Sequence, residues 1–175
     1  MIDTAEQKRW GTIFWSLLGL TLVMLVVMQV TNAPLRNDIA QAGIVSFEFA
    51  GSLAASQAII QSWQGEAKTW ASLNMGLDFL FLFLYGSTIA LACFLVSERM
   101  NRLALKRLGI WLAFGVLFAA ALDIVENVAL INLLLGSESG GLPILAKWMA
   151  IPKFILVLLS LLYVITGMIP ALKKP

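Results

Sequence analysis

Long runs of apolar residues dominate the chain, and four of them are long enough to cross a membrane as helices. A helix needs about 20 predominantly apolar residues to span roughly 30 Å of hydrocarbon. The sequence therefore predicts an all-α integral membrane protein, a four-helix transmembrane bundle. The predicted spans cover about residues 10–30, 69–96, 108–135 and 148–169.

The segment between the first two spans, about residues 36–66, has a different pattern. Apolar and small polar residues are mixed there, and Ile44, Phe47, Ala54 and Ala58 fall near one face of a helix. We expect one or two short amphipathic helices that lie on the outer membrane surface or cap the bundle. Sealing the bundle is the simplest role for such a segment.

The composition agrees with a single transmembrane domain over residues 1–175. The chain is 60% hydrophobic and only 13% charged, with a mean hydropathy of +0.89. Soluble domains carry about 25% charged residues, so a soluble globular domain is excluded. We expect membrane lipids to be the first partners of this chain.

Charge and residue usage also narrow the chemistry. The net charge is +2 and no basic tract is present, which argues against nucleic acid as a partner. Histidine is absent and Cys93 is the only cysteine, so disulfides and most haem, zinc and copper sites are excluded. We therefore expect no metal site and no cofactor.

Lysine and arginine are unevenly distributed between the two sides of the predicted bundle. Eight of the twelve lie at the N-terminus, in the turn between the second and third spans, and in the C-terminal tail. Cytoplasmic loops carry an excess of these residues, so both termini are predicted to be cytoplasmic (N-in and C-in). A bacterial cytoplasmic (inner) membrane fits this pattern. Tryptophans near span ends and in the outer segment suit the membrane interface, namely Trp10, Trp63, Trp70, Trp111 and Trp148.

The third span contains the stretch ALDIVENVAL, in which three polar residues interrupt an apolar run. Asp123, Glu126 and Asn127 stand at i, i+3 and i+4, so they project from one helical face. An intramembrane charge costs about 2.5–3.5 kcal/mol on insertion scales and almost always faces the bundle interior. The stretch is therefore predicted to face the other helices.

The second and fourth spans carry polar residues that can meet this face. Asn74, Asp78 and Tyr85 lie within about 40° of one another on the second span. Helical rise places Asp78 about 13 Å below the outer end of its span and Lys153 about 8 Å below the start of the fourth. Lys153 either extends to the interface or reaches towards Glu126.

The charges in this predicted cluster do not balance. The spans hold three carboxylates and one lysine, and Glu48 with Arg36 from the outer segment would make the ratio four to two. Either some carboxylates are protonated, or water, a cation or a cationic ligand enters. A purely structural role, in which polar contacts hold the helices in register, is the alternative; such contacts average about 0.6 kcal/mol.

Three functions remain open for this chain. The first is an outward-facing carboxylate pocket that binds, and with proton coupling transports, a cationic or amphiphilic small molecule or a lipid; a homodimer would be expected. The second is an accessory or structural subunit of a larger membrane complex. The third is an intramembrane enzyme acting on a lipid or isoprenoid-like substrate, with Glu126 as base, Asp78 or Asp123 as acid, and Lys153 or Tyr85 stabilising charge.

Overall fold

The structure is a computed structural model that describes residues 4–168. It is all-helical, and the described residues form no β-strand. The helices are α1 (Thr4–Asn32), the 3-10 helix η1 (Ala33–Leu35), α2 (Ile44–Glu48), α3 (Leu53–Ser62), α4 (Glu66–Glu98), α5 (Leu103–Leu134) and α6 (Gly141–Gly167).

Four helices are long and apolar enough to cross a membrane, as the sequence predicts. Each begins earlier than its predicted span, and α6 begins seven residues before residue 148. Pro143 is accommodated there because the first turn of a helix has no use for its N–H group. The predicted end of the last span, residue 169, lies outside the described residues.

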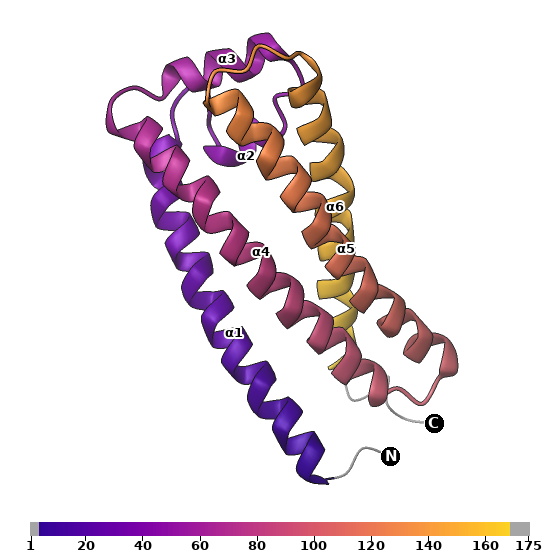
Figure 1. Cartoon of the computed structure of the whole chain (residues 1–175). Helices are drawn as coiled ribbons and strands as arrows, with labels where there is room; N and C mark the ends of the chain where they lie inside the picture. Colours follow the sequence, from indigo (N-terminus) through magenta and orange to yellow (C-terminus); the bar gives the residue numbers. More distant parts are fainter. Residues whose placement is uncertain (1–3, 169–175) are drawn as a thin grey trace.

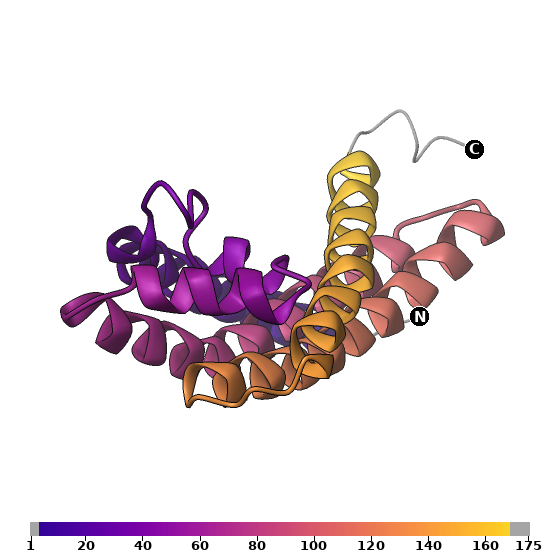
Figure 2. The same ribbon diagram turned by 90° about the horizontal axis from the view of Figure 1, so that it is seen from above.

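The long helices pack in chain order, α1 on α4, α4 on α5 and α5 on α6, with α4 also touching α6 (Figures 1 and 2). Small residues allow the closest approaches. A Cβ atom added at Gly86 of α4 would lie 3.2 Å from Cβ of Ala120 on α5. The two helices that carry most of the polar residues are thereby held near each other.

The helices α2 and α3 close one end of the bundle (Figure 1). α3 crosses this end, and α2 lies beneath it against α5 and α6. The rings of Phe47 and Trp63 pack edge to face with centroids 5.5 Å apart, and Trp63 Nε1 donates to the carbonyl of Leu35 at 2.8 Å. Because Trp63 is only 2% exposed, its assignment to the interfacial tryptophans is wrong.

The single apolar face expected for this segment is also wrong. Phe47 is buried, but Ala54 and Ala58 are exposed, and α3 buries Ile59 instead. Gly51, with a φ of 67°, lies between α2 and α3 and changes the direction of the chain. The two helices therefore do not continue one helical periodicity.

Asn32 fixes the start of α2 from the end of α1. Its Oδ1 accepts a hydrogen bond from the backbone N–H of Ile44 at 2.8 Å, and its Nδ2 donates to the carbonyl of Ala42 at 3.3 Å. Gly43 between them has a φ of 64°, and a Cβ there would overlap the Asn32 carboxamide. This anchor sets the position of Glu48, the last residue of α2.

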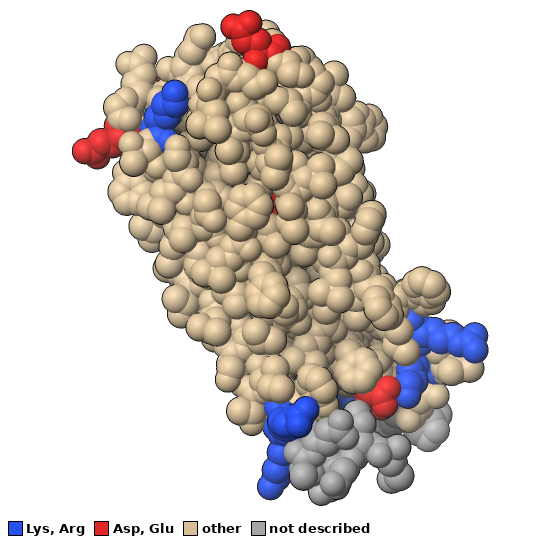
Figure 3. Space-filling model, viewed as in Figure 1, with Lys and Arg blue, Asp and Glu red and all other residues tan. Residues whose placement is uncertain are grey.

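On the face drawn in Figure 3, charged side chains gather at the two ends of the bundle, and the surface between them is largely uncharged. The start of α1, the turn between α4 and α5, and the end of α6 share the end opposite α2 and α3 (Figure 1). The basic residues described at that end are Lys8, Arg9, Arg99, Arg102, Lys106 and Arg107. Lys173 and Lys174, predicted to lie on the same side, are outside the described residues.

Candidate functional site

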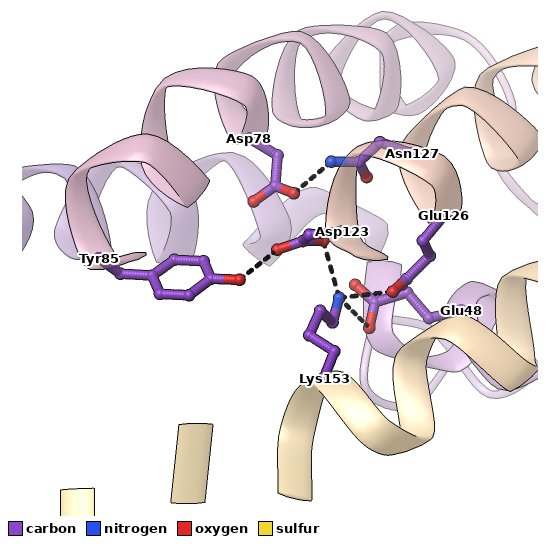
Figure 4. A network of polar contacts seen from close by, with 7 residues as sticks. All are labelled: Glu48, Asp78, Tyr85, Asp123, Glu126, Asn127 and Lys153. Atoms are coloured by element: carbon purple, nitrogen blue, oxygen red, sulfur yellow. Dashed lines mark hydrogen bonds and ion pairs between the residues drawn. The ribbon is translucent and has the colours of Figure 1, made fainter. Parts of the chain in front are cut away.

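Seven polar side chains from α2, α4, α5 and α6 gather beneath α2 (Figure 4). They include every sequence-predicted site residue except Asn74. The members of this carboxylate cluster are Glu48, Asp78, Tyr85, Asp123, Glu126, Asn127 and Lys153.

Lys153 lies at the centre of the carboxylate cluster. Its Nζ is 2.7 Å from Glu126 Oε2, 2.9 Å from Asp123 Oδ1 and 3.8 Å from Glu48 Oε2. The lysine therefore reaches towards Glu126 instead of extending to the interface. Burying an ammonium group in this way is tolerated because opposite charges surround it.

Two hydrogen bonds tie α4 to α5 around this centre. Asp123 uses its second oxygen, Oδ2, to accept from the Tyr85 hydroxyl at 2.7 Å. Asp78 Oδ2 accepts from Asn127 Nδ2 at 2.6 Å. Asp78 makes no ion pair with Lys153 among the described contacts, so its carboxylate belongs to the cluster without a cationic partner.

The cluster holds four carboxylates and one lysine (Figure 4). Arg36, which the sequence left as a second cation, is exposed and donates to Gln29 Oε1 at 3.2 Å instead. Glu126 Oε1 and Glu48 Oε2 are buried without a hydrogen-bond partner in the described part of the chain. The negative excess is therefore larger than the sequence indicated.

Glu48 comes from α2, outside the spanning helices, and its environment disfavours ionisation. Burial raises the pKa of Glu48 well above its ordinary value of 4.5; Lys153 lowers it, and the carboxylates of Glu126, Asp123 and Asp78 raise it further. A proton on Glu48 is thus one means by which the cluster reduces its negative charge.

Asn74 lies on α4 but does not join the cluster. Its Nδ2 donates to Thr31 Oγ1 at 2.6 Å and to the carbonyl of Met28 at 3.1 Å, both on α1. A second contact between these helices joins Thr21 Oγ1 and Thr88 Oγ1 at 2.7 Å. Because α1 packs against this part of α4, Asn74 holds two helices together instead of facing the carboxylates.

Two phenylalanines beside the cluster were missed in the sequence. The Phe154 ring centroid is 4.8 Å from Lys153 Nζ, and Phe154 stacks on Phe49 at 5.7 Å with 24° between the planes. Phe49 and Phe154 are 37% and 42% exposed, so the pair lies at the protein surface. Each directly follows a charged residue of the cluster, but a phenylalanine in an apolar segment gives no signal by itself.

The charged centre is enclosed by protein. Asp123, Glu126 and Lys153 are 3%, 0% and 5% exposed. A hollow of about 270 Å³ lies elsewhere, between α3 and the turn that joins α5 to α6, and no cluster residue lines it. Access to Asp123 and Glu126 therefore requires a side chain or one of the capping helices to move.

No group of three or more acidic or cysteine side chains in residues 4–168 is arranged to hold a metal ion. Comparison with known proteins gives no matching family model, curated protein or solved structure. The chemistry of the site is therefore argued from its own residues.

Proposed function

We propose that the protein binds a cationic small molecule at the carboxylate cluster, in exchange for protons. The ligand approaches from the end closed by α2 and α3, which faces outwards. Both termini are then cytoplasmic, in a bacterial cytoplasmic membrane. The concentration of lysine and arginine at the opposite end supports this orientation, since such residues favour the cytoplasmic side.

The charge excess of the cluster is the observation that carries the proposal. Three carboxylates share one ammonium, a fourth, Asp78, has no cationic partner among the described contacts, and unpaired buried charges are strongly disfavoured. Protons or an added cation can neutralise the remainder. The two are alternatives at the same oxygen atoms, so binding of a cation displaces protons.

A structural role alone accounts for only part of the cluster. Lys153 with Asp123 and Glu126 is sufficient to join α5 and α6. Asp78 and Glu48 add two further carboxylates, and either could be an uncharged residue without loss of that connection. Their presence supports a site that binds cations over one that only holds helices in register.

The experiment is native mass spectrometry of protein released from membranes, with wild type compared to Asp78→Asn and Glu48→Gln. These variants remove charge but leave the closest lysine contacts in place, so they are expected to fold. A small cationic adduct on wild type that is reduced on both variants supports the proposal. Glu138→Gln, in the exposed turn after α5, is the matched control and should retain the adduct.

Wild type that carries no cationic adduct at any pH, or variants that carry it unchanged, would count against the proposal. A second candidate, a subunit of a larger membrane complex, is favoured by α1. This helix packs mainly along α4 and leaves large apolar side chains uncovered, including Trp15, Val23 and Val26. A different protein that co-purifies and appears in the same spectra would support it.

A further inference from the structure

We infer that the ligand is an organic ammonium compound with an apolar body, whose cationic group joins the Lys153 ammonium among the same carboxylates. Phe154 and Phe49 contact the apolar body. This inference rests on the proposed function and adds the ligand class, the ligand-facing rings and the carboxylate that holds the cationic group.

The surroundings of Lys153 Nζ carry the first step. Two carboxylate oxygens lie 2.7 and 2.9 Å from this nitrogen, and a third lies 3.8 Å from it. The centroid of the Phe154 ring is 4.8 Å away. Carboxylates alone suit any cation. An aromatic face within about 6 Å adds attraction for ammonium groups and is used to recognise organic ammonium ligands. The site is therefore complementary to an ammonium group.

The unpartnered oxygen of Glu126 carries the second step. Glu126 is fully buried, and its Oε1 lacks a hydrogen-bond partner in the described structure, whereas its Oε2 forms an ion pair with Lys153 at 2.7 Å. A buried carboxylate oxygen without a donor is costly, and a ligand ammonium has up to three N–H donors to offer. Lys153 alone does not satisfy every acceptor around it.

The rings of Phe49 and Phe154 carry the third step. They stack at the surface beside Glu48 and Lys153, between α2 and α6, and each is more than one third exposed. An apolar group attached to an ammonium in the cluster would meet these rings on its way to the lipid. Inorganic cations make no use of such a surface, so the pair selects for an apolar body.

The test of the ring contacts uses wild type in nanodiscs with phenylethylammonium, ethylammonium and sodium ions as probes. We expect phenylethylammonium to bind more tightly than ethylammonium, and Phe154→Leu to lower its affinity about 3- to 30-fold. Phe114→Leu, an exposed ring on α5, is the control and should have no effect. Equal binding of the two ammonium probes, or unchanged affinity in Phe154→Leu, overturns the inference.

The preference of these carboxylates for an ammonium group is tested by chemical rescue. Lys153→Ala removes the atoms of a propylammonium group, so added n-propylammonium should restore thermal stability to this variant. Propanol, which has the shape without the charge, and sodium ions at equal concentration should not. If sodium ions restore stability as well as propylammonium does, the position is not specific for ammonium groups. A lack of rescue by propylammonium would also refute the inference.

The outcomes separate the two proposals. If Asp78→Asn loses a cationic adduct while Phe154→Leu binds every probe as wild type does, the cluster binds cations and the ligand class is wrong. If wild type binds no cation at all, the proposed function fails and the inference fails with it.

Discussion

The central contacts of Lys153 permit a quantitative prediction for Lys153→Met. Methionine has a similar length and leaves no large cavity, so the change mainly removes the charge. In wild type, Lys153 Nζ contacts Glu126 and Asp123 within 3 Å in a fully enclosed site. Removing one partner of a buried ion pair costs about 3–5 kcal/mol. We expect the free energy of unfolding to fall by this amount at neutral pH. Carboxylates that take up protons in the variant would make the decrease smaller.

The single cysteine provides the assay. Cys93 is completely buried on α4, so a thiol-reactive dye labels it only when the bundle opens. Labelling during a denaturant titration in mixed micelles then gives the free energy of unfolding. Lys147→Met, which changes an exposed lysine near the start of α6, is the matched control and should stay within about 0.5 kcal/mol of wild type.

The reasoning would be refuted if Lys153→Met unfolded within about 0.5 kcal/mol of wild type. That result would mean that the carboxylates around the lysine are protonated and need no cation. A loss equal to that of Lys147→Met has the same meaning. In either case the charge excess that supports cation binding would not exist.

Three further predictions concern the edges of the site. Asp78→Asn keeps an acceptor for the Asn127 amide, so the free energy of unfolding should change by less than about 1 kcal/mol. A larger decrease in the thiol-labelling assay would show that Asp78 has a structural role. Glu48→Gln tests the raised pKa of Glu48: a proton held more tightly in the folded state stabilises wild type fully below pH 4.5, and this contribution is lost as pH rises towards the folded-state pKa. Glutamine cannot ionise, so the stability of Glu48→Gln relative to wild type should increase with pH in melting experiments; a constant difference would contradict it. Gly43→Ala forces a Cβ into the Asn32 carboxamide at a positive φ and should cost about 1–3 kcal/mol, with unchanged stability as the contrary result.

The long helices could be predicted because the membrane imposes a simple rule. Backbone groups in hydrocarbon must be satisfied within the segment, so long apolar runs form helices. Helix ends were less accurate, as in α6, because Pro143 and Lys147 interrupt the apolar run without interrupting the helix. Hydropathy reports where a segment is apolar, and the backbone hydrogen bonds extend beyond that region.

Helical spacing anticipated much of the cluster geometry and failed where a neighbour had to be known. Asp123, Glu126 and Asn127 share one face of α5, and the structure brings them to α4 and α6. Asn74 has the same periodicity as Asp78 on α4, yet it contacts α1. Spacing gives the direction of a side chain relative to its own helix, but which helix lies opposite depends on packing that periodicity does not encode.

The loop between the first two spans decides the charge of the site. Glu48 and Arg36 were equally available in the sequence, and their charges would have cancelled. The turns at Gly43 and Gly51 place Glu48 over Lys153, while Arg36 remains exposed beside Gln29. The site thus holds four carboxylates and one ammonium because of backbone conformations outside the membrane spans. A substitution that releases α2 would therefore change the electrostatics of a site whose other carboxylates lie on α4 and α5.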